Sequence, residues 1–475
     1  MSQLTVSHAS TLPPTSRGYG GRAAPVAILA LLALLITPSG ANAAPPTSPL
    51  TTDPADAAAG WLTGELVDGD HLTTEFDLDG NAMIDPVTEV FPDYGLTADA
   101  VLAFAAAGSA GNAANAATDY LAANVSGYAG DGTVESYAGS LAKLILVADI
   151  MGRDPTAFGG RNLITDLQAR LQPDCSDILV CPNPGRYSDA SEFGDFSNPL
   201  GQALAIIGLE RTTTDGAPAT AVDFLVSVQC ADGGFVSDLS ALPCATGEVD
   251  TTALAVQALA LVGRDAATDA ATAYLIGQQA ADGSFAAPGF GNPPVTTANA
   301  NSTGLAAQAL RVLGSGDAAD DAVGWLLGRQ IGADGPQEQQ GAFAFDATGF
   351  DPANATRATT QAILGVAGIG FAALAPPADP LAYGLDVGVE DGVPPPPAAG
   401  PPAAGPPAAG PPAAAPPAAG PPAVGPPAAG PPAAAPVPLP ATGAAPRGLI
   451  GLGFGLLGVG IAASVIGRRR THGPA

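Results

Sequence analysis

The sequence predicts an all-α fold whose helices form two concentric layers. A unit of about 50 residues, the length of a helical pair, occurs twice between Ala221 and Leu310. Each copy contains a glutamine, a Gly-x-Phe turn and then an apolar helix. The matching residues are Gln229 with Gly233-Gly234-Phe235 in the first copy, and Gln279 with Gly283-Ser284-Phe285 in the second.

Two kinds of helix alternate along the chain. The segment 253–262 is apolar on every side except at Gln257, as a buried helix would be, whereas 265–279 is apolar on one stripe only and should face solvent. We therefore expect outer helices that each lead into an inner one. Six of each kind can close a ring, with outer helices starting near residues 55, 112, 161, 219, 266 and 318 and inner helices near 93, 136, 195, 250, 301 and 354.

Small residues mark the expected helix ends. Glycine favours the left-handed turn that ends a helix, and three glycines follow outer helices: Gly233, Gly283 and Gly335. Four Asp or Asn residues, each seven positions before a glutamine, are predicted to be N-caps of inner helices: Asp195, Asp250, Asn301 and Asn354. In a parallel arrangement they form a rim at the positive ends of the helix dipoles, and with Arg357 they are the candidate ligand site.

These repeats resemble the QW repeat of squalene and other triterpene cyclases, and the related repeat of protein prenyltransferase β subunits. The likeness covers residues 55–376 and implies an (α/α)6 toroid. An aromatic residue and a leucine precede a glutamine and a Gly-x-Phe turn, in which Phe replaces the usual Trp. The matches are Phe224-Leu225 with Gln229, Tyr274-Leu275 with Gln279, and Trp325-Leu326 with Gln330, the last followed by Gly341-Ala342-Phe343.

The residues that would carry the activities of these families are missing. Class II terpene cyclases use an Asp-x-Asp-Asp acid, and Asp77-Leu78-Asp79-Gly80 lacks its last Asp; prenyltransferases bind zinc through Asp, Cys and His, and the toroid's one histidine is His71. Complement-like thioester domains share the barrel but need Cys-Gly-Glu-Gln, which is absent. Cobalamin carriers also use this toroid, and nothing in the sequence excludes that use. We expect no catalytic residue, metal or cofactor.

The two ends of the chain indicate export and anchoring. Residues 1–43 have a basic start, an apolar run and a small-residue cleavage site, which predict a secretory signal peptide; a spacer, 44–54, follows. Residues 377–438 are rich in Pro, Ala and Gly and are expected to form a disordered, semi-extended stalk.

Residues 439–475 resemble a sortase cell-wall sorting signal. An LPxTG motif precedes an apolar segment, 448–467, that is long enough to be a transmembrane helix, and three arginines follow. The resemblance implies cleavage between Thr442 and Gly443, attachment of Thr442 to peptidoglycan, and a location on the wall of a Gram-positive-type bacterium. The motif residues are Leu439, Pro440, Ala441, Thr442 and Gly443.

Cysteine content fits an exported chain. The four cysteines suggest two disulfides, and we favour the local pairs Cys175 with Cys181 and Cys230 with Cys244, although three pairings are possible. Their spacing does not match a zinc site.

Net charge excludes some partners. The formal charge is −28 and Lys143 is the single lysine, so nucleic acid and anionic membrane surfaces are not expected partners. The leading hypothesis is a non-catalytic, wall-anchored surface protein whose toroid binds a ligand or partner. The alternatives are an extracellular enzyme of the terpene-cyclase or prenyltransferase type and a capture protein for a corrinoid or other small molecule.

Overall fold

The computed structural model describes residues 51–76, 84–86, 88–173, 183–213, 215–288 and 296–378. All of them belong to the unit that spans Ser48–Ala475. The predicted signal peptide, the predicted stalk from residue 379 onward, the predicted sorting motif and the predicted span 448–467 lie outside this part of the chain. No helix within the described residues is long and apolar enough to cross a membrane.

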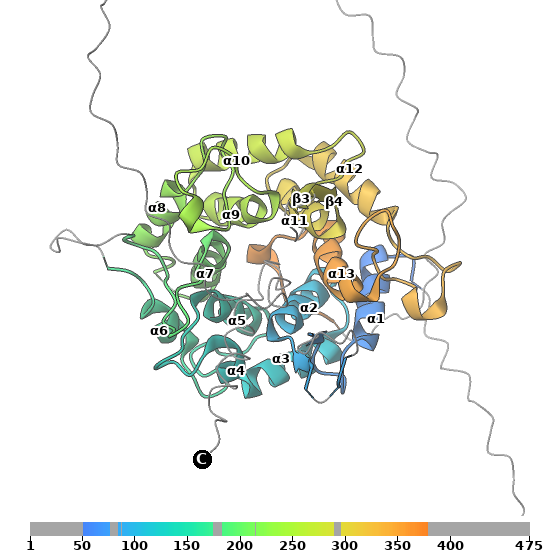
Figure 1. Cartoon of the computed structure of the whole chain (residues 1–475), viewed down its shortest axis with the longest axis horizontal. Coiled ribbons are helices and arrows are strands. Elements are labelled where there is room, and N and C mark those ends of the chain that lie inside the picture. Colours follow the sequence, from blue (N-terminus) through green and yellow to red (C-terminus); the bar gives the residue numbers. More distant parts are fainter. Residues whose placement is uncertain are drawn as a thin grey trace, which may run out of the picture. The chain divides into compact units, whose positions relative to one another are not determined.

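Helices of the described residues form the predicted double ring (Figure 1). The inner helices are α2 (Tyr94–Ala107), α5 (Ala138–Ile150), α7 (Pro199–Thr212), α9 (Val249–Leu261), α11 (Ala300–Val312) and α13 (Pro352–Ala367). The outer helices are α1 (Pro54–Gly64), α3 (Gly111–Ala123), α6 (Leu163–Gln168), α8 (Ala219–Ser227), α10 (Asp265–Gln278) and α12 (Gly316–Leu327). Six helices of each kind are present, as predicted.

Short elements connect the two layers. Two hairpins are described, each of two antiparallel strands, β1 (Thr73–Glu75) with β2 (Val90–Pro92) and β3 (Ala286–Pro288) with β4 (Thr296–Ala298). The others are α4 (Val125–Ala129), η1 (Leu239–Ala241), η2 (Gln337–Gln339) and η3 (Phe371–Ala373).

The inner helices are buried on all sides, as their composition requires. In α9, ten of the eleven residues from Val249 to Leu259 are buried, and Asp250 is partly exposed. Small side chains let neighbouring inner helices approach closely. A Cβ atom on Gly304 of α11 would lie 2.2 Å from the carbonyl oxygen of Gln361 on α13, so this crossing requires glycine. The core between the two layers therefore consists mainly of alanine and leucine side chains.

The repeated glutamines join consecutive outer helices. The Gln229 side-chain amide donates to the carbonyl oxygens of Gly233 (2.8 Å) and Ala267 (2.9 Å), and Gln279 donates to Gly283 (3.1 Å) and Ala318 (2.8 Å). Each glutamine thus binds its own turn and the next outer helix. Gln330 makes the same contacts with Gly341 (3.1 Å) and with Pro54 (2.8 Å) at the start of α1, which closes the ring.

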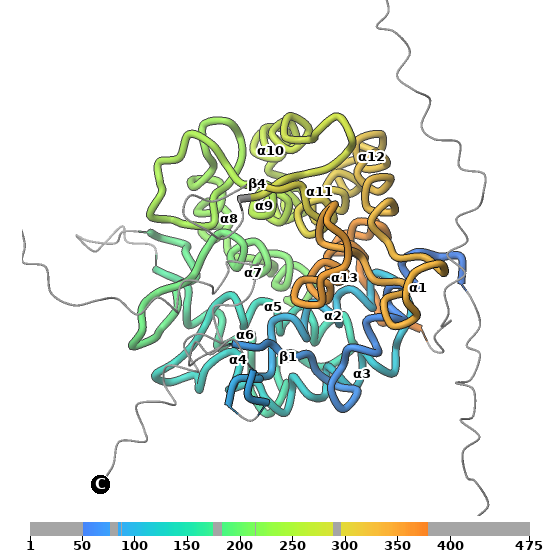
Figure 2. The backbone as a smooth tube through the Cα atoms, turned by 45° about the vertical axis from the view of Figure 1, so that its right-hand side comes forward, coloured from blue at the N-terminus to red at the C-terminus, as the bar shows by residue number. Residues whose placement is uncertain are grey.

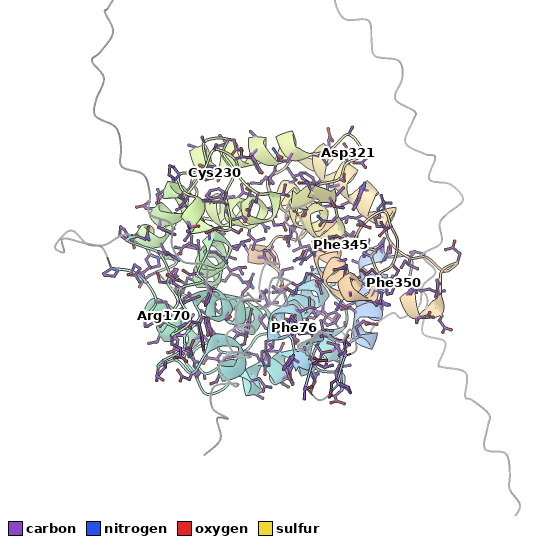
Figure 3. The ribbon with its side chains drawn as sticks, viewed as in Figure 1. Phe76, Arg170, Cys230, Asp321, Phe345 and Phe350 are labelled. Atoms are coloured by element: carbon purple, nitrogen blue, oxygen red, sulfur yellow. A yellow bond between two sulfur atoms is a disulfide. The ribbon has the colours of Figure 1, made fainter. Side chains whose placement is uncertain are left out.

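Ring closure is reinforced by aromatic side chains. The Trp61 indole N–H donates to the carbonyl oxygen of Glu338 at 2.9 Å. The same ring packs edge-on against Phe350, 6.2 Å between centroids, at the side of the ring where Figure 3 labels Phe350. The first and last units are therefore neighbours in space.

The prediction of a left-handed turn glycine was wrong at one of the three positions, Gly335. Gly233 and Gly283 adopt the left-handed backbone, with φ of 92° and 89°, but in the third copy Gly341 does so, with φ of 95°, and Gly335 does not. The third turn is longer because it contains η2, so the glycine that Gln330 binds comes six residues later than expected.

Candidate functional site

Four of the six inner helices, α2, α9, α11 and α13, share one register, which defines equivalent positions at their N-terminal ends. A threonine near the start of each of these helices accepts a hydrogen bond from a backbone N–H in the loop before the helix. The distance is 2.9–3.0 Å in each case. The pairs are Thr97 with Leu72, Thr252 with Phe235, Thr303 with Phe285, and Thr359 with Phe343. Two positions before each threonine stand Gly95, Asp250, Asn301 and Arg357, and we call the N-terminal ends of the inner helices, where these residues lie, the mouth.

Three of the predicted rim residues, Asp250, Asn301 and Arg357, therefore occupy equivalent mouth positions. Their role is not capping. Asp250 and Asn301 are already inside α9 and α11, where the N-cap positions belong to Glu248 and Asn299. The Asn299 side chain accepts the Ser302 N–H at 2.9 Å, so Asn301 is left free of that task.

The other two predicted rim residues, Asp195 and Asn354, do not join them. Asp195 lies in the loop before α7, where its carboxylate pairs with Arg186 at 2.9 Å. The Asn354 side chain is exposed and donates to the Asp351 carboxylate at 2.7 Å.

The N-cap predictions for α7 and α13 failed because another cap-forming residue lies three positions away, Asn198 after Asp195 and Asp351 before Asn354. Asn198 and Asp351 each precede a proline, and proline at the first helical position fixes the start of α7 and α13. Their side chains accept the N–H of Gly201 (2.9 Å) and of Ala353 (3.1 Å).

The α9–α11 side of the mouth holds three buried polar atoms with few hydrogen bonds. Asn301 Oδ1 has no described partner, whereas Asp250 Oδ1 and Ser302 Oγ lie beside each other, and Ser302 is fully buried. Burial raises the pKa of Asp250 to about 6; the Ser302 hydroxyl beside it opposes this shift in part, and Glu248 adds to it. These atoms are mainly hydrogen-bond acceptors.

A buried charged cluster forms the α2–α5–α13 side of the mouth. The Lys143 ammonium on α5 contacts the Asp99 carboxylate on α2 and donates to the carbonyl oxygen of Gly95 at 3.1 Å. Arg357 of α13 reaches Asp93, the N-cap of α2, with 3.6 Å between Nη2 and Oδ2. Asp99 Oδ2 and Arg357 Nη1 have no hydrogen-bond partner among the described residues, and the Tyr128 hydroxyl of α4 lies beside the Ser140 side chain.

Burial perturbs the pKa values of this cluster. It raises the pKa of Asp99, although the Lys143 charge opposes that shift, and it lowers the pKa of Lys143 to about 8 against the effect of Asp99. Burial also raises the pKa of Tyr128 well above its ordinary value, with Asp99 adding to the shift. Both partners of the ion pair are therefore held closer to their neutral forms than they would be in water.

The opposite end of the inner helices is closed by the end of the described chain. Residues 368–378, which we call the strap, cross the C-terminal ends of these helices. Gln308 donates to the carbonyl oxygen of Ile369 (2.7 Å), Gln257 accepts the Phe371 N–H (3.3 Å), and the two glutamines bond each other (3.1 Å). Seven positions earlier, on the same faces of α9 and α11, are Asp250 and Asn301.

A pocket lies at the strap end, and most of its polar side chains already bond other residues of the chain. It has a volume of about 400 Å³ and is lined by Asp149, Glu210, Arg211, Leu261 and Ala372. Arg211 pairs with Asp149 (2.7 Å) and donates to three strap carbonyl oxygens, those of Phe371, Ala372 and Leu374. These contacts hold the strap and leave little for a ligand, so the mouth is the better candidate site.

The remaining predicted groups have varied outcomes. Cys230 and Cys244 form a disulfide (Figure 3 labels Cys230), whereas Cys175 and Cys181 lie outside the described residues. Asp77-Leu78-Asp79-Gly80 also lies outside them. Among the residues described, no group of three or more His, Cys, Asp or Glu side chains is placed to hold a metal ion.

Sequence reasoning did not assign a role to Asp99, Lys143 or Tyr128. A signal was present, since Asp99 and Lys143 each interrupt a helix whose other residues are almost all apolar. A charged residue in such a helix is rarely buried without a partner, and the partner had to be found elsewhere in the chain.

Comparison with known proteins gives likenesses in fold. No protein-family model matches the chain, and no curated protein matches it significantly. Solved structures that resemble it include a protein from Actinoplanes (14% identity, 66% of this chain and 98% of that chain, TM-score 0.44). Others are a type II terpene cyclase from Scytonema with geranylgeranyl dihydroxybenzoate (15%, 67% and 96%, 0.47) and an unsaturated glucuronyl hydrolase specific for heparin (11%, 66% and 95%, 0.45). These likenesses concern the fold alone.

Proposed function

We propose that this chain is a secreted, sortase-anchored surface protein whose toroid binds a small polar ligand at the mouth and does not catalyse a reaction. The observation that carries the proposal is a set of buried polar atoms on adjacent N-terminal turns. Asn301 Oδ1 and Arg357 Nη1 have no described partner, and Asp250 Oδ1 and Ser302 Oγ have at most each other. A buried polar group without a hydrogen bond costs about 1–3 kcal/mol, and a bound ligand or water can remove that cost.

The unpaired atoms specify the chemistry of the ligand. The Asp250 and Asn301 oxygens are acceptors, so the ligand must donate hydrogen bonds, and Arg357 requires one acceptor on it. Glu248 and Asp250 form no described ion pair, which favours a cationic donor. A polyhydroxylated amine meets all three requirements, whereas a polyprenoid meets none.

A thermal-shift titration of the full chain tests this assignment. Glucosamine is the probe, with glucose, spermidine and farnesol for comparison. We expect glucosamine to raise the Tm of the unmodified chain, and we expect the shift to be lost in Asp250→Ala and Asn301→Ala. Asn354→Ala is the matched control, since this exposed Asn on α13 lies outside the mouth and should bind as the unmodified chain does. A shift that survives both mouth substitutions would place the ligand elsewhere.

Anchoring is tested separately in the host bacterium. The LPxTG residues, the apolar segment and the arginines support covalent attachment through Thr442, with sortase and peptidoglycan as partners. Thr442→Ala should move the protein from the wall fraction to the membrane and the medium. If the Thr442→Ala variant is still released from cells only by wall-degrading enzymes, the proposal is wrong.

An extracellular polyprenoid-converting enzyme is the second candidate. The observation in its favour is Asp99, a buried inner-helix carboxyl whose pKa is raised by burial and whose Oδ2 has no described partner, because an acid of this kind can give up a proton inside a dry site. Conversion of a polyprenyl alcohol or diphosphate by the purified chain, lost in Asp99→Ala, would establish it and overturn the non-catalytic proposal.

A further inference from the structure

Lys143 is an unusual residue for its position. It is the single lysine of a chain with a net charge of −28, and it is fully buried in the middle of α5. Burying an ammonium group is costly, and lysine is almost never fully buried without a partner. The methylene stem alone does not account for it, because Leu or Met would fill the same space without a charge.

The partner of Lys143 is held directly against it. Asp99 belongs to α2, the neighbouring inner helix, and one of its carboxylate oxygens contacts the Lys143 ammonium. The Gly95 carbonyl oxygen accepts a second hydrogen bond from Nζ at 3.1 Å and fixes its direction. The other carboxylate oxygen, Oδ2, is sealed from solvent and has no described partner. The amine and the carboxyl carbon are thus adjacent in a largely buried site.

The groups around the pair suit a reaction between them. Asp93 and Arg357 are close enough to influence the ionisation of both Asp99 and Tyr128. Asp99 in turn influences Tyr128, which is almost fully buried. Loss of the two opposite charges would leave Arg357 with Asp93, so no buried charge would be stranded. Burial already shifts the pKa values of Lys143 and Asp99 toward the free amine and the neutral acid.

We propose that Lys143 and Asp99 become joined by an intramolecular isopeptide bond that links α5 to α2. Nζ attacks Cγ of Asp99, the Nζ–Cγ bond forms and one Cγ–Oδ bond breaks. Two protons of the ammonium leave with that oxygen as water, and one remains on the amide nitrogen. Tyr128 or Asp93 relays the proton from nitrogen to the departing oxygen. The step is redox-neutral and needs no co-reactant.

Because the chain has one lysine, its chemical state can be measured directly. The full chain is purified, reduced, denatured and treated with an amine-reactive label. We expect an intact mass lower by one water than the sequence requires, label at the N-terminus only, and no tryptic cleavage after Lys143. Digestion at aromatic residues between the two positions, such as Phe104 and Tyr120, should yield a two-chain peptide that contains both Asp99 and Lys143.

Two variants control the measurement. Lys143→Arg and Asp99→Ala should each have the full mass of their sequence, whether or not they fold, since neither can form the bond. A mass deficit of one water in any measurable fraction of the unmodified chain, assigned to these two residues by fragmentation, supports the proposal. The proposal is overturned if the unmodified chain has its full mass, Lys143 takes the label and trypsin cleaves after it. Lys143 and Asp99 would then form an ion pair only. Neither result depends on whether the mouth binds glucosamine.

Discussion

At the scale of single residues, Asp250 shows how burial can keep a polar group ready for a ligand. Its carboxylate lies one residue inside α9, where the Ser302 hydroxyl is its one described polar neighbour and the nearby Glu248 adds negative charge. The folded chain therefore holds a proton on Asp250 up to a higher pH than the unfolded chain does.

This shift has a defined effect on stability. Because the pKa of Asp250 rises from 3.8 to about 6 on folding, its favourable contribution is complete below pH 3.8 and is lost as the pH rises through about 6. Asp250→Asn should raise the free energy of unfolding by about 1–2 kcal/mol at pH 7, after allowance for partial exposure, and by nothing at pH 3.5. Urea unfolding at both pH values measures this. Asp269→Asn, at an exposed position on α10, should show no such pH-dependent gain.

At the scale of elements, the joints between outer helices carry the repeat. Gln279 ends α10 and donates two hydrogen bonds, one of them to α12. Gln279→Ala removes both and leaves two partly buried carbonyl oxygens unpaired, so we expect a loss of about 1–3 kcal/mol in urea unfolding. The neighbouring Gln278→Ala is the control, because this side chain is exposed and should change stability by less than about 0.5 kcal/mol. Equal effects would show that the joint contributes nothing.

The turn glycine of the same joint gives an independent test. Gly283 has φ of 89°, and a Cβ atom there would lie 2.2 Å from the carbonyl oxygen of Asp321 on α12. Gly283→Ala should therefore lower the free energy of unfolding by at least about 2 kcal/mol. Gly277→Ala, six residues earlier in α10 and in open space, should raise it by up to about 0.5–1 kcal/mol. Thermal unfolding of the two variants should move in opposite directions.

At the scale of the whole ring, Arg211 fastens the strap. It bonds Asp149 and three strap carbonyl oxygens, so Arg211→Ala should cost about 2–3 kcal/mol and expose residues 369–378 to proteolysis. Arg264→Ala, which removes an exposed pair with Asp223, should cost less than about 1 kcal/mol and leave the strap protected. Limited digestion followed by mass spectrometry distinguishes the two. If the strap of the Arg211→Ala variant resists proteolysis as well as that of the unmodified chain, Arg211 does not hold the strap.

The layers of the ring were predictable because each repeat makes the same contacts. Gln229, Gln279 and Gln330 bind equivalent carbonyl oxygens, so their spacing in the sequence is fixed by the fold. Features outside the repeat were not predictable. The Asp99–Lys143 pair joins residues 44 positions apart, and the strap has no counterpart in the other units. The cap predictions failed where Asn198 and Asp351 competed with residues at the repeat spacing.

The strap also determines how the ring would respond to mechanical load. Its last described residue, Ala378, exchanges two backbone hydrogen bonds with the turn after α2, with Gly108 at 3.1 Å and Gly111 at 3.2 Å. A pull on the C-terminal tail would therefore reach α2 first and the Arg211 contacts next. An isopeptide bond between α2 and α5 would add a covalent link at the helix that receives this load first. A ring on a wall-anchored stalk would thus be reinforced near its point of attachment.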